Sequence, residues 1–162
     1  MSTSSLNTEM LQSTFLEALE DEQTEVIRGI LSSHKKELTS EWRFRKPQGG
    51  WPYPAEVEND AYTFLGAYQG PITALQLAIL LGKNSIACDI LDSTFEQDID
   101  LQFGNGNTAL HLAVLLGESS IVSALVERGA DVNLRNRKGY SSVDMSDNPE
   151  ILALLNIQSP EE

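Results

Sequence analysis

A ten-residue segment occurs twice in this chain, 35 residues apart. Residues 73–82 read Thr-Ala-Leu-Gln-Leu-Ala-Ile-Leu-Leu-Gly, and residues 108–117 read Thr-Ala-Leu-His-Leu-Ala-Val-Leu-Leu-Gly. The likeness continues beyond both glycines, as far as Leu91 in the first copy and Val126 in the second. A period in this range is typical of chains built from stacked repeat units, so it constrains the fold more than any other feature of the sequence.

Two weaker copies flank the clear ones. Residues 139–145 match 106–112 with an offset of 33. On the other side, residues 18–31 match 113–126 without a gap, with Glu22 where the other copies have glycine. The chain therefore contains about four related units, of which the outer two have diverged most.

Each unit has the pattern of two short helices. In the clearest copy, the apolar residues of 109–113 have helical spacing, and Gly117 suits the left-handed turn that ends a helix. Apolar residues recur with helical spacing over 121–126, and Gly129 follows them. Helices this short are not stable alone, so they must bury their apolar faces against neighbouring units.

The second clear copy resembles an ankyrin repeat almost throughout, in the residues Gly106-Asn107-Thr108-Ala109-Leu110-His111-Leu112-Ala113, then Gly117, Ile121-Val122 and Gly129-Ala130-Asp131-Val132-Asn133. The resemblance covers roughly 14–32 and 70–156, and it is weakest at the two ends. It implies an all-α solenoid of helix-turn-helix units joined by short hairpin loops, with one aromatic-rich insertion. The expected segments are a flexible N-terminus at 1–10, a single domain at 11–157 with repeats at 14–32, 70–102, 103–135 and 136–156, an insertion at about 33–69, and a flexible acidic tail at 158–162.

Three positions of the repeat carry specific expectations. Thr108 can cap its helix by accepting a backbone N–H. The resemblance implies that His111 bridges backbone groups of adjacent turns. Gln76 replaces this histidine in the preceding copy, which puts the corresponding bridge in doubt. The family's proline after the threonine is Ala74 and Ala109 here, and we expect this change to cost little because alanine also suits a first helical turn.

The insertion separates the first unit from the second. The chain takes 44 residues from Leu31 to Leu75, whereas the equivalent step from Val126 to Val143 takes 17. An unstructured loop of that length is unusual in a compact domain, and this segment is rich in aromatic residues, unlike a disordered linker. The aromatic residues of the insertion either widen the core or contact a partner. The candidate residues for partner contact are Trp42, Arg43, Arg45 and Trp51.

The resemblance implies that a partner is contacted by the hairpin tips and by the first helix of each repeat. The two positions before each helix-ending glycine are commonly exposed in the family, and here they are Leu80, Leu81, Leu115 and Leu116. They form either an exposed apolar patch, which would mark a partner site, or a surface that the insertion covers. We favour the covered alternative for Leu80 and Leu81, and Leu115 and Leu116 are candidate contacts.

The hairpin tips differ in their chemistry. One contains Phe103, Asn105 and Asn107, and the next contains a basic run with an aromatic residue, namely Arg135, Arg137, Lys138 and Tyr140. Such a run is either a solvated loop or a site for an acidic patch on a partner, with Tyr140 as the anchor.

The charge of the chain limits its partners. It carries 24 acidic and 11 basic residues among 162, for a net charge of −13. This balance argues against nucleic acid and against an anionic membrane surface, and it is compatible with a basic or neutral protein. The single cysteine, Cys88, excludes an internal disulfide and fits a reducing compartment, so we expect the cytoplasm or the nucleus.

No phosphate-binding loop, nucleophile elbow or metal-binding spacing occurs in the sequence. We therefore expect no enzyme, no cofactor and no metal. The predicted function is a non-catalytic protein–protein interaction module that acts as an adaptor, an inhibitor or an escort and is monomeric when free. The alternatives are an enzyme with a carboxylate-based site at the insertion and a structural homo-oligomer formed through the leucine patch. Paired acids such as Asp98 and Asp100 lack an implied cleft or an aligned acid–base partner.

Overall fold

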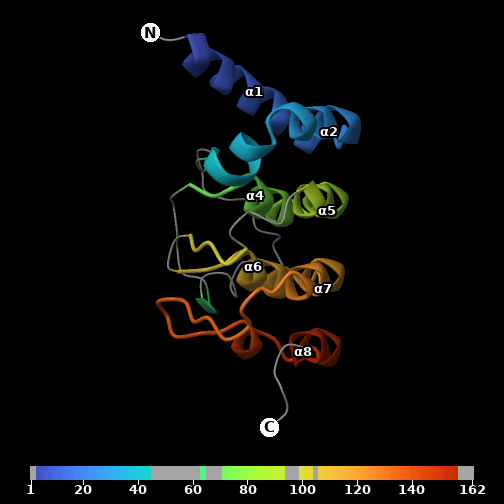
Figure 1. The fold of residues 1–162 in the computed structure, drawn as a ribbon. Coiled ribbons are helices and arrows are strands. Elements are labelled where there is room, and N and C mark those ends of the chain that lie inside the picture. Colours follow the sequence, from blue (N-terminus) through green and yellow to red (C-terminus); the bar gives the residue numbers. More distant parts are fainter. Residues whose placement is uncertain (1–2, 45–62, 65–70, 94–98, 104–105, 157–162) are drawn as a thin grey trace.

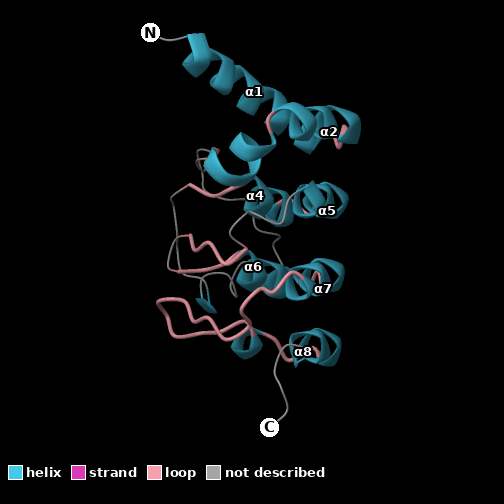
Figure 2. Ribbon diagram, viewed as in Figure 1, coloured by secondary structure: helices cyan, strands magenta, loops and turns pink. Residues whose placement is uncertain are grey.

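The computed structural model describes residues 3–44, 63–64, 71–93, 99–103 and 106–156. These residues form short helices and turns, and none of them forms a strand (Figure 2). In chain order the helices are α1 (Thr3–Glu20), α2 (Thr24–Ser33), the π-helix η1 (Glu37–Glu41), α4 (Ala74–Leu80), α5 (Asn84–Ser93), α6 (Ala109–Leu116), α7 (Ser119–Glu127), the 3-10 helix η4 (Val143–Met145) and α8 (Pro149–Asn156).

The helices are arranged as pairs that follow one another in a row (Figure 1). Within the pairs, α1 contacts α2, α4 contacts α5, and α6 contacts α7. Between the pairs, α4 contacts α6, and the second helices α2, α5, α7 and α8 contact one another in that order. We call the side that carries these four helices the second-helix side, and the opposite side, from which the turns near 103–107 and 136–140 project, the hairpin side (Figure 1). This paired arrangement confirms the helical units that the repeat predicted.

Left-handed residues join the two helices of the first three pairs. Gly82 has φ +74° and Gly117 has φ +71°, a region that glycine enters without a steric penalty. Glu22 has φ +55° at the matching position of the first pair. This is the place where the sequence comparison put Glu22 in register with the glycines, so the alignment of that weak copy is confirmed at this position.

Threonine caps begin the two clear first helices. The hydroxyl oxygen of Thr73 accepts a hydrogen bond from the backbone N–H of Gln76, and that of Thr108 accepts one from the N–H of His111. In both caps the side chain three residues later bonds back to the threonine N–H, which completes a capping box. The predicted cap at Thr108 is therefore confirmed, and Ala74 and Ala109 occupy the first helical position without loss of the cap.

The hydrophobic core runs along the whole row rather than filling one closed centre. Ala78 and Ala113 are fully buried on the first helices, where their small side chains let neighbouring helices approach closely. Large, fully buried side chains lie in every pair, among them Phe15, Leu19 and Ile27 in the first, Ile79, Ile86, Ile90 and Leu91 in the second, Leu110, Leu112, Ile121 and Leu125 in the third, and Ile151 and Leu155 in the last. Each pair thus depends on its neighbours to keep its apolar face from water.

The N-terminal end of the row differs from the expectation. Helix α1 begins at Thr3, so most of segment 1–10, which we expected to be a flexible N-terminus, is helical. This end also carries exposed apolar side chains, Met10, Leu16 and Val26. Val26 is 37% exposed, whereas Ile121 at the aligned position is fully buried. The difference follows from position, because the first pair has no preceding pair among the described residues to cover it.

The beginning of the predicted insertion packs on the first helix pair. Trp42 lies 6.3 Å from Phe15 and 6.4 Å from Phe44 between ring centroids, both in edge-to-face geometry, and Phe15 stacks on Phe44 at 5.5 Å. All three rings are buried. The backbone of Phe44 then pairs with Ile72, just before α4, through hydrogen bonds of 2.8 and 2.9 Å. For Trp42 the core alternative is the one that the structure supports, and the contact alternative is corrected.

Candidate protein-binding surface

Two turns on the hairpin side are closed by backbone hydrogen bonds between residues four positions apart. The backbone groups of Phe103 and Asn107 exchange hydrogen bonds of 2.7 and 2.8 Å, and the Asn136 N–H donates to the Tyr140 carbonyl at 3.0 Å. Among their described residues, the first turn has Gly106 at φ +81° and the second has Gly139 at φ +90°. These glycines supply the conformation that the tight reversal of the chain requires.

His111 connects α6 to the second of these turns. Its ring is fully buried, its Nδ1 accepts the N–H of Thr108 at 3.1 Å, and its Nε2 lies 2.9 Å from the carbonyl oxygen of Tyr140. Because Nδ1 accepts, the proton is assigned to Nε2, which donates to Tyr140. Burial lowers the pKa of His111 below its ordinary value, and the bond to the Tyr140 carbonyl offsets part of that effect. The predicted bridge between adjacent turns is confirmed.

Gln76 makes the equivalent bridge one unit earlier. Its Oε1 accepts the N–H of Thr73 at 2.9 Å, and its Nε2 donates to the carbonyl of Leu101 at 3.1 Å. A glutamine amide offers one acceptor and one donor group, as a neutral imidazole does. The doubt that the sequence raised about this bridge was wrong, although the receiving carbonyl precedes the Phe103–Asn107 turn instead of lying within it.

A buried asparagine joins the two turns to the insertion. The Asn136 Nδ2 donates to the Asn107 Oδ1 at 2.7 Å and to the Phe64 carbonyl at 2.7 Å. Its Oδ1 accepts the N–H groups of Lys138 and Tyr140 at 3.0 and 3.1 Å. The ring of Phe64 meets that of Tyr140 edge-to-face, with centroids 4.9 Å apart. Phe64 of the insertion therefore lies against the 136–140 turn.

The basic residues of the 136–140 turn lie at the surface. Arg135, Arg137 and Lys138 are exposed. The Arg135 Nη1 donates to the Gly139 carbonyl at 2.7 Å and to Asp144 Oδ2 at 2.9 Å, which holds the guanidinium in place. Hydrogen bonds from Ser141 and the Arg135 charge keep the pKa of Asp144 below its usual range. The sequence thus predicted an exposed basic run correctly.

The other candidate contact residues differ from the basic run in their exposure to solvent. Tyr140 is partly buried against Phe64, and Arg43 is exposed. Phe103 and Asn107 are buried within their turn, because one packs on the core and the other bonds to Asn136, so neither presents its side chain to a partner. Arg45, Trp51 and Asn105 lie outside the described residues.

The leucines before the helix-ending glycines do not form an open apolar patch. Leu80 and Leu115 are buried, with Leu115 8% exposed, and Leu81 and Leu116 are partly buried against the core. Leu80 and Leu81 are thus not an open apolar surface, and most of the insertion that we expect to cover them lies outside the described residues. For Leu115 the burial corrects the expectation of an exposed contact, because the side chain belongs to the apolar core.

A comparison with protein-family models identifies one family in this chain. The ankyrin repeat model matches residues 105–137, which contain α6, α7 and part of the turn on either side of them. The chain contains an ankyrin repeat. No curated protein matches the chain. The matched segment includes Thr108, His111 and Gly117, the residues whose cap, bridge and left-handed turn are described above.

On the second-helix side of the chain, acids and bases pair across neighbouring units. Arg28 of α2 bonds to Asp89 of α5 at 3.1 Å, and Arg128 after α7 bonds to Asp92 of α5. Lys83 likewise pairs with Glu22 at 2.9 Å. Part of the acidic charge on this side is therefore neutralised within the fold, and these ion pairs join one helix pair to the next.

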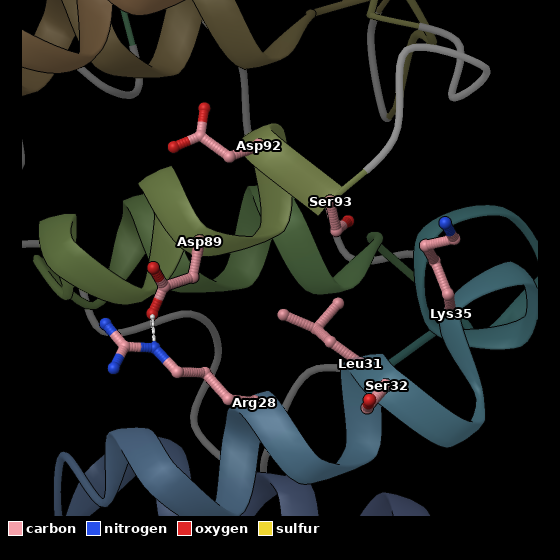
Figure 3. Close-up of a pocket in the computed structure, with 7 residues that line it drawn as sticks. All are labelled: Arg28, Leu31, Ser32, Lys35, Asp89, Asp92 and Ser93. Carbon is pink, nitrogen blue, oxygen red and sulfur yellow. Dashed lines mark hydrogen bonds and ion pairs between the residues drawn. The ribbon is translucent and has the colours of Figure 1, made fainter.

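Figure 3 shows a groove of about 390 Å³ between α2 and α5 on this side. The Arg28–Asp89 ion pair closes one end, Lys35 stands at the other, and Leu31 points into the space between the helices. Asp92 points away from α2, toward the α7 side. The groove combines both signs of charge with an apolar floor, so its lining selects no particular class of ligand.

Metal-ligating side chains do not gather in the part of the chain that the structure describes. That part holds no group of three or more His, Cys, Asp and Glu residues that could bind a metal ion. The carboxylate of Asp100 accepts the backbone N–H of Asp131 at 2.9 Å, which makes it part of a link between units, and Asp98 lies outside the described residues. Among the described helices, none is long and apolar enough to cross a membrane.

Proposed function

We propose that this ankyrin-repeat protein is a non-catalytic module that binds a protein partner on its hairpin side and on the adjoining face of its first helices. In this proposal the row of helix pairs is a continuous ankyrin solenoid, and its partner lies along the projecting turns. The presence of an ankyrin repeat supports a role in protein–protein interaction. The role of adaptor, inhibitor or escort and the cytosolic or nuclear location belong to the same proposal.

One observation carries it. The 136–140 turn is fixed from within by the side chains of His111 and Asn136, while Arg135, Arg137 and Lys138 on the same turn are exposed. Binding is weakened when loops must be ordered as the partner arrives. Here buried hydrogen bonds have already ordered the turn, so its charged side chains are presented in a defined position. Charged side chains on a preformed turn suit recognition rather than catalysis.

The charge distribution describes the partner further. The net charge of −13 attracts a partner that is basic overall and repels polyanions at long range. The local charge of the 136–140 turn is positive and suits an acidic patch. A partner protein of basic or neutral net charge with an acidic segment at its contact surface satisfies both conditions.

Site-specific photocross-linking in extracts of the source cells tests the proposal. A photoreactive amino acid replaces exposed Lys138 on the hairpin side, and a matched variant carries it at exposed Glu127 on α7. We expect one partner to be cross-linked from position 138 in amounts well above those from position 127. Cross-links that form equally from both positions, or from position 127 alone, would remove the hairpin side as the binding surface.

A further inference from the structure

A cleft of about 270 Å³ lies between the two consecutive turns of the hairpin side. Gln102 and Gly106 line it from the first turn, and Arg135, Asn136 and Arg137 line it from the second. No acidic residue is among these five. The lining is therefore positive, in contrast to the groove of Figure 3, where Asp89 offsets Arg28.

The absence of a side chain at position 106 keeps the cleft narrow and walled by backbone. A Cβ placed on Gly106 would lie 3.3 Å from the backbone nitrogen of Arg137 and 3.3 Å from the Nε2 of Gln102. That amide nitrogen donates to the Gly106 carbonyl at 2.8 Å and holds the turn in place. The backbone of Arg137 thus comes close to the first turn, and the two turns form the two walls of one site.

The arginines that line the cleft have N–H donors without an acceptor among the described residues. Within the residues that the structure describes, neither the backbone N–H nor the guanidinium of Arg137 has an acceptor. Arg135 uses its Nη1 to bond to Gly139 and Asp144, which orients the rest of its guanidinium without consuming it. The amide of Asn136 is fully occupied by its own turn, by Asn107 and by Phe64. Unpaired N–H donors on two arginines match the oxygens of a carboxylate, which can accept two parallel bonds from one guanidinium.

We propose that this cleft binds the carboxylate of a glutamate or aspartate side chain in an acidic segment of the partner protein. The inference rests on the proposed function, because it names the group that the hairpin side recognises. A protein carboxylate fits better than a phosphate polyanion, since the net charge of −13 repels a polyanion while a single carboxylate on a basic or neutral protein meets little repulsion. Arg137 is the principal donor, and Arg135 is held beside it by Asp144.

Titration of the purified chain with a blocked Gly-Glu-Glu-Gly peptide tests the proposal, with backbone amide chemical shifts as the readout. The neutral Gly-Gln-Gln-Gly peptide and inorganic phosphate serve as comparison ligands, at about 0.15 M salt so that the net charge is screened over roughly 8 Å. We expect saturable shifts at the amides of Gly106 and Arg137 with the glutamate peptide. The variant Arg137→Gln should weaken this binding about tenfold, the equivalent of one lost charge-assisted hydrogen-bond pair.

Arg28→Gln is the matched control. Arg28 resembles Arg135, the other arginine of the cleft, because both side chains are 62% exposed and each pairs with one aspartate. Arg28 lies on the second-helix side, away from the cleft, so Arg28→Gln removes one arginine charge without changing the cleft. Binding that is unchanged in Arg28→Gln and lost in Arg137→Gln supports the cleft. Equal loss in both variants, equal binding of the neutral peptide, shifts produced by phosphate alone, or no shifts would each overturn it. None of these results touches the photocross-linking outcome, so the inference can fail while the proposed function stands.

Discussion

Gln76 and His111 occupy the same place in consecutive helix pairs and make the same two kinds of hydrogen bond. Each accepts the N–H of the capping threonine three residues earlier, and each reaches a backbone carbonyl at the following turn, with Gln76 bonding to Leu101 and His111 to Tyr140. Both side chains are buried. They couple the beginning of a helix to the next turn, so each unit positions its neighbour, and they differ in that only the histidine titrates near neutral pH.

This difference predicts a pH dependence that belongs to one residue. Burial lowers the pKa of His111 in the folded protein below the ordinary value of 6.5, so the unfolded chain binds the proton more tightly. Stability should therefore be complete above pH 6.5 and fall as the pH decreases from there toward the folded-state pKa. His111→Gln, which copies the unit at Gln76, should flatten the profile between about pH 7.5 and pH 5.5. Urea unfolding at each pH provides the measurement. His34→Gln is the control, and if that variant alone flattened the profile, His111 would not be the titrating group.

Replacing Gln76 by a residue without hydrogen-bonding groups should lower the stability of the fold more than replacing it by histidine. Gln76→Leu leaves the Thr73 N–H and the Leu101 carbonyl without this partner in a buried region, which should lower the free energy of unfolding by about 2–4 kcal/mol. Gln76→His restores one acceptor and one donor and should cost less than about 1 kcal/mol. Chemical unfolding followed by circular dichroism measures both. Equal costs for the two variants would show that the amide acts by its volume and not by its hydrogen bonds.

Two glycine-to-alanine changes should have opposite signs. Gly117 has φ +71° with no atom within 4 Å of an added Cβ, so Gly117→Ala should destabilise by about 1–2 kcal/mol through backbone strain alone. Gly29 lies inside α2 and also has free space, so Gly29→Ala should stabilise by about 0.5–1 kcal/mol. Thermal unfolding of the two variants in parallel tests the expectation. Changes of the same sign would contradict the assigned conformation of one of these glycines.

Trp42 should behave as a core residue. Its ring is buried against Phe15 and Phe44, so Trp42→Ala should lower the free energy of unfolding by about 3–5 kcal/mol. Its exposed neighbour provides the control, because Arg43→Ala should change stability by no more than about 0.5 kcal/mol. If Trp42→Ala left stability intact and abolished capture of the partner, the ring would belong to the interface.

Features with local causes were predictable from the sequence. The caps at Thr73 and Thr108 and the turns at Gly82 and Gly117 depend on residues a few positions apart, and the 35-residue repeat reports them twice. The register of the weak first copy was predictable as well, since Glu22 adopts the left-handed conformation of the glycines that it replaces. The exposed basic run of the 136–140 turn followed from composition alone.

Features that depend on contacts between distant residues were not predictable. The hydrogen bond from Asn136 to Phe64 joins residues 72 positions apart, and no sequence pattern in either segment predicts it. The burial of Trp42 depends on a helix that begins at Thr3, in a stretch whose serines and threonines gave no helical signal. The bridge at Gln76 was missed for a different reason: the change from histidine was judged by residue type, although the amide keeps both hydrogen-bonding groups.

Hydrogen–deuterium exchange on the free chain and on its complex with the cross-linked partner tests the central claim most directly. The account predicts new protection at residues 101–103, 106–107 and 134–140 on the hairpin side, and unchanged exchange in α5, α7 and α8 on the second-helix side. Protection confined to α5, α7 and α8, with the turns exchanging as in the free chain, would contradict it.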